Sequence, residues 1–440
     1  MYQRLRHSAV ASDASVLLLL VRVGIGRARG WPAPRAALLK DLVTALRRVR
    51  WGPVRTVLEA ALRLFVVGEH ADVWRVEEIG WERVREEIAT AVLPKSLILK
   101  APGPAGEKGV LYVSFEVNWL RLMAWHDLPA VLETYDFVGA SSWSPPDYAA
   151  TLALATAARD AVFIQISNRD DLARYRVCSP RIRALPLMAC DWINPNFYAP
   201  RPHADREIDL LMVAGWAEFK GHALLFRALR QMDARLRVVL IGQDMDGRTA
   251  DDVWREARAF GVAGRVELLR DAPPALVSDY QCNSRASVVL SRREGSNVVT
   301  AESFFADTPV AMLRGAHVGA RAYINRSTGL LTDPRHLARD LSHLVEESAR
   351  YAPRSWALTH ITCFQSTARL NGAIRAYAED RRLPWTRDIV AMCWRPDPVY
   401  VNAQDALEML PAYEAMERQH GIRFRPSTTA PGVPSPAIAR

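Results

Sequence analysis

Two glutamates eight positions apart, Glu294 and Glu302, are the side chains of this sequence best placed to do chemistry. Carboxylates accept hydrogen bonds from hydroxyl groups, so a sugar or a ribose is a suitable ligand. The same spacing occurs twice more, at Glu69/Glu77 and Glu78/Glu86. Those two pairs lie in a charged helical stretch without a turn, which predicts a solvated helix face. The spacing alone therefore does not single out Glu294 and Glu302, and only the residues around them can do so.

The surroundings of Glu294 predict a strand, a turn and the start of a helix. Residues 286–290 form a β-branched apolar run that is typical of a strand. Ser296 and Asn297 are good caps for a helix predicted over residues 298–305. Backbone N–H groups at a helix start, with the helix dipole behind them, favour an anion such as a diphosphate. The sequence thus predicts a diphosphate site with a carboxylate on each side.

This arrangement resembles the donor site of retaining nucleotide-sugar glycosyltransferases of the two-domain GT-B type, in particular glycosyltransferase family 4. The family motif reads Glu-Gly, then a second Glu with seven residues between the two glutamates, then a small residue before Thr-Pro-Val. Glu294-Gly295, Glu302 and residues 307–310 fill these places here. Asp307 stands where the family usually has Gly.

Three further landmarks resemble the same family and occur in the same order. Residues 211–222 resemble the first strand of its nucleotide domain, with the Lys-Gly turn at Lys220. Residues 185–197 match the linker that enters that domain, and residues 328–331 match a Thr-Gly-Leu turn near its end. The resemblance covers residues 185–335 well and the first hundred residues hardly at all.

The resemblance implies roles for individual residues. Glu294 would hold hydroxyls of the donor sugar, Glu302 the ribose and Lys220 the phosphates. Glu294 and Lys220 are thus the expected catalytic residues, and the expected donor-binding residues are Glu302, Gly215, Gly295, Ser296, Asn297, Val298, Arg292 and Arg293. The donor would be a nucleoside diphosphate sugar, and the chemistry would require no metal or other cofactor.

One position departs from the family pattern. The family places an Arg directly after the Gly of the first strand, where it helps the Lys to hold the phosphates, but this chain has Trp216. A planar aromatic ring cannot neutralise phosphate charge. Arg292 or Arg293 can supply the missing cation by bidentate contact. The alternatives are that both arginines cover the surface while Lys220 and the helix start hold the diphosphate, or that the donor binds weakly.

The alternation of strand and helix patterns predicts an α/β fold with parallel sheets. Together with the resemblance, it predicts GT-B architecture: two Rossmann-like parallel-sheet domains facing a cleft, with C-terminal helices crossing back. The expected strands are 110–115, 135–140, 161–166, 208–213, 237–241, 266–269, 287–290 and 309–312. The expected domains are 1–200 on the acceptor side, 201–354 for the nucleotide sugar, mostly helical 355–420 packing back on the first domain, and a disordered tail 421–440.

Ligands of open parallel sheets lie beyond the carboxyl ends of the strands. In the first domain this rule points to an acceptor-side group: Glu116, Asn118, Ser142, Trp143 and Asn168. Such side chains suit sugar hydroxyls and rings, whereas the alternative is that Ser and Asn here are turn or cap residues. His126-Asp127 follows an apparent helix, which favours a structural role.

The composition, 440 residues with 50% hydrophobic and 24% charged, suits a large enzyme of two or three domains. No apolar run approaches the roughly 20 residues of a membrane span. Asp13 precedes the longest run without a nearby cleavage site, which argues against a secretory signal. The spacing of the five cysteines argues against disulfides or zinc. We expect a cytoplasmic protein.

The formal net charge of +9 is spread along the chain, with a concentration of arginines in residues 40–63. A basic amphipathic surface can rest on anionic lipid, which would make the protein peripheral on the cytoplasmic face of the membrane. The alternative is an ordinary domain helix with an arginine-rich outer face. No aromatic and basic cluster or known module points to nucleic acid.

Two other patterns in the sequence compete with the glutamate motif. Asp244 and Asp246 follow a strand and could ligate a divalent metal, but the triplet is frequent by chance and lies where the family has a variable loop. Gly24, Gly26 and Gly30 loosely match a dinucleotide fingerprint, but two prolines interrupt the helix that should follow. We interpret the first as a loop and the second as a turn.

The function predicted from the sequence is a retaining glycosyltransferase that moves a hexosyl unit from a nucleoside diphosphate sugar to a hydroxyl of a saccharide or lipid-linked saccharide. Such a reaction belongs to the biosynthesis of surface polysaccharide or glycoconjugates. The alternative is a non-catalytic protein of the same fold that binds a nucleotide sugar or a saccharide. Trp216 and Asp307 favour the alternative, whereas Lys220 and the two glutamates favour the enzyme.

Overall fold

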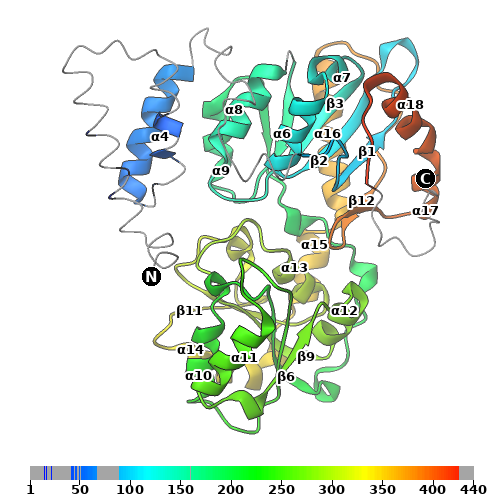
Figure 1. The fold of residues 1–440 in the computed structure, drawn as a ribbon. Coiled ribbons are helices and arrows are strands. Elements are labelled where there is room, and N and C mark those ends of the chain that lie inside the picture. The colour runs from blue at the N-terminus through cyan, green and yellow to red at the C-terminus, as the bar shows by residue number, and fades with distance from the viewer. Residues whose placement is uncertain are drawn as a thin grey trace. The chain divides into compact units, whose positions relative to one another are not determined.

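The computed structural model describes residues 51–66, 89–158 and 160–425, with a few isolated positions between 14 and 49 (Figure 1). The chain forms two compact units. Unit 1 comprises Met1–Pro186, Ala378–Arg387 and Met409–Pro426, and unit 2 comprises Leu187–Tyr377, Asp388–Glu408 and Ser427–Arg440. The division therefore falls before residue 187, earlier than the boundary expected at 200. Two segments from the last quarter of the chain return to unit 1.

Unit 1 is built on a five-stranded sheet in the order β1-β2-β3-β4-β5. The strands are Ser96–Lys100, Gly109–Ser114, Tyr135–Ala140, Val162–Gln165 and Ile182–Leu185. Strands β2 to β5 are parallel neighbours, whereas β1 is antiparallel to β2. The first three parallel strands lie where the sequence predicts them, and β1 and β5 extend the sheet on either side.

Helices connect the parallel strands of unit 1. They are α6 (Glu116–Trp125), α7 (Leu128–Thr134), α8 (Tyr148–Ala157) and α9 (Asp171–Cys178), and α4 (Gly52–Val66) precedes the sheet. Helix α8 packs against both α6 and α9, and α4 packs against α9. Residues 148–155 of α8 are all buried, as expected for a helix that is apolar around its whole circumference.

Helices make up most of the C-terminal part of the chain, which also contains a hairpin. Helices α15 (Pro353–His360), α16 (Cys363–Asp380), α17 (Ala403–Glu408) and α18 (Leu410–His420) are present, but β12 (Met392–Trp394) and β13 (Pro398–Tyr400) form an antiparallel hairpin. Within unit 1, the Tyr413 hydroxyl of α18 accepts a hydrogen bond from Ile98 N at 3.1 Å. This contact ties the returning chain to strand β1.

Unit 2 is a doubly wound parallel sheet in the order β11-β10-β9-β6-β7-β8. The strands are β6 (Ile208–Val213), β7 (Val238–Gly242), β8 (Val266–Arg270), β9 (Ser284–Val289), β10 (Val310–Leu313) and β11 (Gly329–Thr332). Numbered from β6 as the first strand, and read from β8, the order is 3-2-1-4-5-6, which is the Rossmann order. The direction of winding reverses between β6 and β9.

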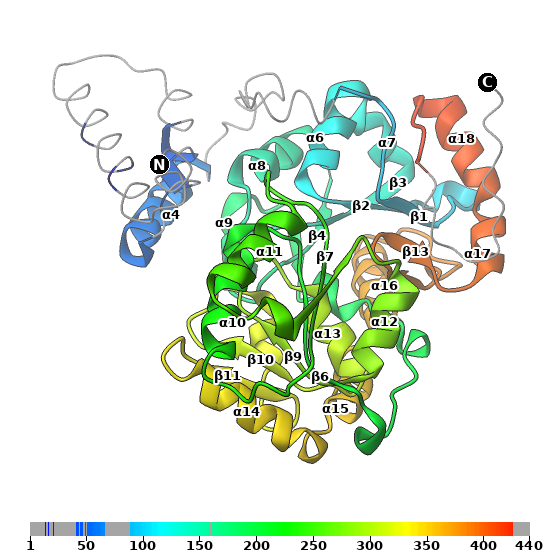
Figure 2. The ribbon, with the colours of Figure 1, turned by 60° about the horizontal axis from the view of Figure 1, so that its bottom comes forward.

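Helices cover both faces of this sheet (Figure 2). Helices α10 (His222–Leu229), α11 (Ala250–Ala259) and α14 (Leu337–Glu346) lie on one face, and α12 (Pro274–Cys282) and α13 (Val298–Phe305) lie on the other. Two-sided cover explains why the strands are apolar runs without alternation. In such sheets ligands bind beyond the carboxyl ends of the strands where the winding reverses, here after β6 and β9.

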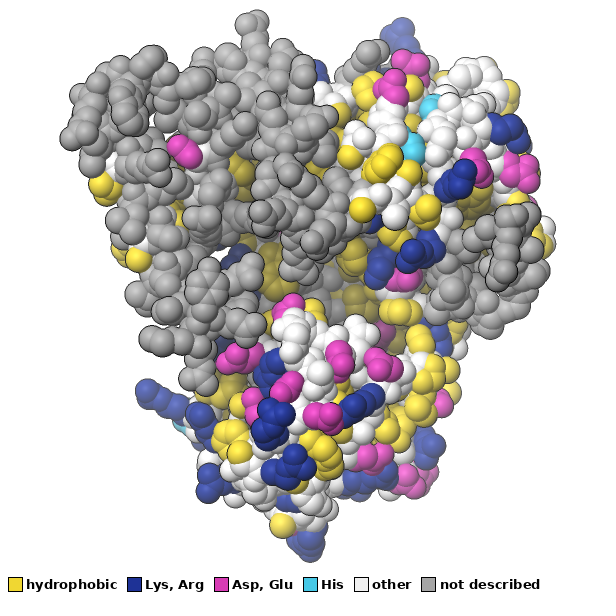
Figure 3. All heavy atoms as spheres, in the orientation of Figure 1, with side chains coloured by type: hydrophobic (Ala, Val, Ile, Leu, Met, Phe, Trp, Pro, Cys, Tyr) yellow, Lys and Arg dark blue, Asp and Glu magenta, His cyan; other side chains and the backbone are white. Residues whose placement is uncertain are grey.

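Several expectations concern the chain as a whole. No helix within the described ranges is both long and apolar enough to cross a membrane. All five cysteines are free and buried. Basic and acidic side chains are interspersed on the face of unit 2 that Figure 3 shows. The glycines at 24, 26 and 30 and the tail beyond 425 lie outside the described residues.

Candidate active site

A tight approach of two loops brings Lys220 to the end of β9. Lys220 ends a short 3-10 helix, Glu218–Lys220 (η7), after β6. Gly221 follows with φ +86, and a Cβ atom there would lie 2.8 Å from the carbonyl oxygen of Leu290, which directly follows β9. A side chain at this position would be strained in its backbone and would also clash. Glycine therefore allows the β6 loop to reach the β9 loop.

Glu294 is held by three side-chain donors at this place. Its carboxylate is buried, with a residue exposure of 8%. Lys220 Nζ lies 2.7 Å from Glu294 Oε1, and Ser291 Oγ donates to the same oxygen. Asn297 Nδ2 donates to Glu294 Oε2 at 2.9 Å. The carboxylate is thus fixed in orientation before any ligand arrives, as a pre-organised site requires.

The start of α13 lies next to this carboxylate. Asn297 has φ +60, and its Oδ1 caps the helix by accepting from Thr300 N at 3.1 Å, as the sequence predicts. The carbonyl oxygens of Gly295 and Ser296 accept from Gly319 N and Ala320 N at 2.8 and 2.9 Å. Within the described chain, the N–H groups of Gly295 and Ser296 have no protein acceptor. They are therefore free to bind an anion.

Glu302 lies further along α13 and is half-buried. Its Oε2 accepts a hydrogen bond from Gln281 Nε2 of α12 at 3.3 Å. Burial raises the pKa of Glu302, while the hydrogen bond from Gln281 and the charge of Arg395 act in the opposite direction. The second glutamate thus belongs to unit 2 with the first, but it has separate partners.

Trp216 is fully buried and packs against the end of strand β7. A Cβ atom at Gly242, the last residue of β7, would lie 3.0 Å from its ring, and the ring centroid of His222 is 5.5 Å away. Burial, together with the charges of Arg248 and Lys220, lowers the pKa of His222 to about 3. Among the described residues, neither His222 ring nitrogen nor Trp216 Nε1 has a hydrogen-bond partner.

The two arginines before Glu294 differ in their surroundings. Arg292 is exposed, whereas Arg293 is half-buried. The backbone of Arg293 forms an isolated parallel bridge with His317. Both remain candidates for the phosphate cation. The first glycine of the predicted site, Gly215, lies against the neighbouring loop, because a Cβ atom there would be 2.9 Å from Met245 Sδ.

The predicted acceptor-side residues lie in unit 1 at the carboxyl ends of β2, β3 and β4. Glu116 begins α6, and its buried carboxylate accepts from Ser142 Oγ at 2.6 Å and from Ser142 N at 3.1 Å. Burial raises the pKa of Glu116 to about 7, against the hydrogen bonds from Ser142, which lower it. A carboxyl group with such a pKa can exchange a proton near neutrality.

Other members of the predicted acceptor group have different roles. Asn118 Nδ2 donates to the backbone oxygens of Ser114 and Pro94 at 2.6 and 3.2 Å, which is a structural role. Asn168 Oδ1 accepts from Asp170 N at 3.2 Å in a turn, as the alternative interpretation proposed. Trp143 is 39% exposed.

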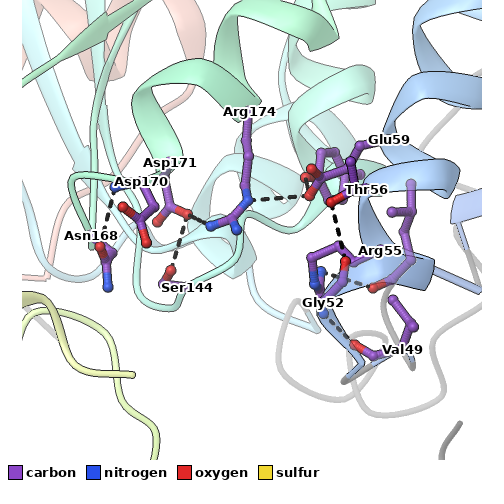
Figure 4. Close-up of polar contacts among 12 residues, drawn as sticks. Val49, Gly52, Arg55, Thr56, Glu59, Ser144, Asn168, Asp170, Asp171 and Arg174 are labelled. Atoms are coloured by element: carbon purple, nitrogen blue, oxygen red, sulfur yellow. Dashed lines mark hydrogen bonds and ion pairs between the residues drawn. The ribbon is translucent and has the colours of Figure 1, made fainter. Parts of the chain in front are cut away.

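Asp171 is a buried carboxylate that sequence reasoning did not single out. Its Oδ1 accepts from Ser144 Oγ at 3.0 Å and pairs with Arg174 NH1 at 2.8 Å (Figure 4). Burial raises the pKa of Asp171 to about 6, against the opposing effects of Arg174 and Ser144. The signal was an aspartate in the first turn of a helix that follows a strand, and it is too common to stand out.

The basic segment 40–63 is only partly described, and the one arginine whose side chain is described, Arg55, is buried. Arg55 of α4 is buried, and its guanidinium donates to the backbone oxygens of Leu46 and Val49 (Figure 4). Glu59 of the same helix accepts from Tyr148 OH at 2.8 Å and from Arg174 Nε at 3.2 Å. The prediction that Arg55 lies on an outer or lipid-facing surface is therefore wrong. The side chains of Arg47, Arg48, Arg50 and Arg63 lie outside the described set.

Two further motifs can be placed. The ring nitrogens of His126 lie 3.2 and 3.3 Å from the backbone oxygens of His420 and Ala91, which agrees with the structural role expected for it. Asp246 lies in a tight turn between Met245 and Arg248. In the described part of the chain, no three His, Cys, Asp or Glu side chains are grouped so as to hold a metal ion.

The comparisons with known proteins agree with this geometry. Residues 207–347 match the model of the family described as glycosyl transferases group 1. The matched segment is similar to a glycosyl transferases group 1 domain. It contains Lys220, Glu294 and Glu302, and it coincides with most of unit 2. No curated protein sequence matches the chain significantly.

Solved structures match a larger share of the chain. HepE from Anabaena in complex with UDP is 13% identical with a TM-score of 0.51, over 78% of this chain and 97% of that one. Sucrose-phosphate synthase from Thermosynechococcus elongatus is 16% identical with a TM-score of 0.50, over 62% and 74%. The chain has the GT-B fold. In this GT-B fold, unit 2 carries the glutamate motif and unit 1 carries Glu116.

Proposed function

We propose that this protein is a retaining glycosyltransferase that moves a hexosyl unit from a nucleoside diphosphate sugar to a hydroxyl of a saccharide or lipid-linked saccharide. The observation that carries the proposal is the contact of Lys220 Nζ with Glu294 Oε1 at 2.7 Å. The contact joins the loops after β6 and β9, where the winding of the sheet reverses. A phosphate-binding cation and a hydroxyl-binding carboxylate are therefore adjacent at the place where such sheets bind nucleotides.

The surrounding groups support this assignment. The N–H groups of Gly295 and Ser296 and the N-terminus of α13 can stabilise charge that develops on the leaving diphosphate. Glu302 would bind the ribose, in line with the motif. HepE was solved with UDP and with UDP and glucose, which supports a nucleoside diphosphate sugar as donor. The retaining outcome rests on the likeness of the motif to family 4.

The test is Glu294→Gln, which keeps the size of the side chain and removes its charge. We expect the variant to lose turnover while it keeps its fold, because the amide still accepts a hydrogen bond but no longer pairs with Lys220. The measurement is release of nucleoside diphosphate from a panel of UDP-, GDP- and ADP-sugars, with and without saccharide acceptors. Product NMR would report the anomeric configuration.

Glu346→Gln serves as the matched control because Glu346 is exposed at the end of α14. Unchanged turnover in Glu294→Gln would contradict the assignment. The second candidate function is a non-catalytic nucleotide-sugar binding protein. Burial of Trp216 at the place of the family Arg favours it. Binding of a donor by the wild type without any turnover, across the whole panel, would support that alternative.

A further inference from the structure

The donor site as described contains less positive charge than a diphosphate needs. Lys220 is the cation of the motif, but its charge is balanced by Glu294 at 2.7 Å. Trp216 occupies the position of the second cation and is fully buried. A diphosphate brings at least two negative charges, so a further cation close to the β6 loop would stabilise it.

The loop after β7 carries an arginine to this place. Strands β6 and β7 are parallel neighbours, so the loops that follow them lie at the same edge of the sheet. Trp216 N donates to the carbonyl oxygen of Gln243 at 2.9 Å, and Met245 Sδ lies against Gly215. Arg248 is bonded in both directions to Met245, with N···O distances of 3.0 and 3.1 Å.

The turn that presents Arg248 is a tight hairpin turn. Asp246 and Gly247 both have positive φ, +53 and +73, as in the type I′ turn of a two-residue hairpin. The side chain of Arg248 is 18% exposed and pairs with Glu256 of α11, with Arg248 NH2 2.8 Å from Glu256 Oε1. The guanidinium of Arg248 thus lies near the protein surface and is paired with the partly exposed carboxylate of Glu256.

The charge of Arg248 acts on the buried ring of His222. After burial, Arg248 is the next cause of the low pKa of His222, ahead of Lys220. Both cations therefore act on the same buried ring. Trp216 Nε1 and both ring nitrogens of His222 are buried without hydrogen-bond partners in the described structure, so unpaired polar groups gather here.

We propose that Arg248 supplies the second cation for the donor diphosphate, in place of the arginine that Trp216 displaces; this inference rests on the proposed function. On donor binding, the guanidinium leaves Glu256 and binds the phosphate oxygens, for which a planar fork is well suited. Arg292 and Arg293 are the competing candidates, and they come from the loop after β9 instead of the loop after β7.

The test measures binding of the diphosphate separately from binding of the nucleoside. UDP, GDP and ADP, with the corresponding monophosphates and nucleosides, are titrated calorimetrically into the full chain and into Arg248→Gln. We expect the dissociation constant for the preferred diphosphate to rise about 10- to 100-fold in the variant, the range typical of a charge-assisted contact. The constant for the nucleoside should not change.

Three further variants sharpen the result. Arg255→Gln is the matched control, because Arg255 lies on α11 with a side chain 72% exposed and pairs with Asp252. Arg248→Lys keeps the charge without the fork and should show a smaller loss than Arg248→Gln. Glu256→Gln removes the competing carboxylate and should bind the diphosphate severalfold more tightly. The melting temperature of each variant without ligand reports on folding.

The outcomes separate this inference from the proposed function. Wild-type protein that binds no nucleoside diphosphate overturns both. Wild-type binding with an unchanged constant in Arg248→Gln overturns the inference alone, and a diphosphate-specific loss in Arg292→Gln or Arg293→Gln would then name the cation. An equal loss for diphosphate and nucleoside in Arg248→Gln would assign Arg248 a structural role and would also overturn the inference.

Discussion

Asp307 and Arg354 are joined by a hydrogen bond from Arg354 N to Asp307 Oδ1 at 3.1 Å, while Asp307 itself adopts a left-handed backbone with φ +56. The family motif usually has Gly at this position, and the conformation explains that preference. Aspartate tolerates the left-handed region better than most residues, and its short side chain can bond locally. In this chain the side chain also anchors the start of α15.

We therefore predict that Asp307→Ala destabilises the protein by about 1 to 3 kcal/mol, from the strain of a left-handed alanine and the lost hydrogen bond. Asp307→Gly relieves the strain and loses only the bond, so it should cost less. Asp307→Asn keeps both features and should be close to neutral. Urea denaturation of the three variants checks the ranking. An alanine variant as stable as the asparagine variant would disprove the explanation.

Glu302→Ala tests recognition of the ribose. A ligand at 100 times its dissociation constant adds about 2.7 kcal/mol of stability. We expect thermal stabilisation by the preferred ribonucleoside diphosphate to fall in this variant, and the preference over the 2′,3′-dideoxy analogue to disappear. Because burial raises the pKa of Glu302, the wild-type preference should also weaken as the pH falls and the carboxylate is protonated. Gln281→Glu removes the side chain that donates to Glu302. If this variant kept the preference for ribose, the role of Glu302 in binding the ribose would be contradicted.

Glu116 makes the stability of the protein depend on pH. Burial raises its pKa from the ordinary 4.5 to about 7 in the folded chain, so the folded state binds the proton more tightly. The stabilising contribution of this group is greatest below about pH 4.5 and falls as the pH rises towards 7, by up to about 3 kcal/mol. Glu116→Gln should remove this fall. Chemical denaturation between pH 5 and 8 measures it.

The control for this prediction is Glu133→Gln, because Glu133 is exposed on α7. Its pH dependence should match that of the wild type. If Glu116→Gln and wild type lose stability in parallel between pH 5 and 7, the carboxyl group is not the source.

The buried pair Lys100 and Glu107 fixes the returning segment of the chain within unit 1. Lys100 Nζ lies 2.7 Å from Glu107 Oε1, with both side chains almost fully buried, and Thr386 N donates to Glu107 Oε1 at 2.8 Å. Burial would raise the pKa of Glu107, but the bonds from Lys100 and Thr386 lower it to about 2. The pair therefore persists throughout the physiological pH range.

Lys100→Met should cost about 3 to 5 kcal/mol of stability, because it leaves a buried carboxylate without its counter-ion. The double variant Lys100→Met with Glu107→Gln should recover part of that loss. Urea denaturation of the single and double variants forms the measurement. A single variant that unfolds like the wild type would show that the backbone donors near Thr386 suffice.

The sequence predicted the sheet of unit 2 well because its strands are continuous apolar runs flanked by clear turns. Strand β6 was predicted at 208–213 and is Ile208–Val213. Strand β9 begins earlier than predicted, because Ser284 and Arg285 carry no apolar signal. The hairpin of β12 and β13 was missed because three-residue strands have no period to detect. It forms through tertiary contacts, among them Trp394 N donating to Trp192 O at 2.8 Å.

The candidate site divides in the same way. Glu294, Lys220 and the cap Asn297 could be predicted because local motifs carry them. Arg248 could not, since its relevance depends on how closely the loops after β6 and β7 approach each other. The partners of Glu116 could not be predicted either, because Ser142 lies in the loop after the next strand, β3, and reaches Glu116 only in the folded sheet.

Helix α8 has a consequence for how the chain can be divided. All residues from 148 to 155 are buried, and the helix packs against α6 and α9. A helix without a polar face cannot be exposed to water without promoting aggregation. A shortened chain that ends between α6 and α9 would therefore be insoluble, whereas a cut at the junction of the two units spares this layer. We therefore expect that α6, α8 and α9 must be kept or removed together in any shortened chain.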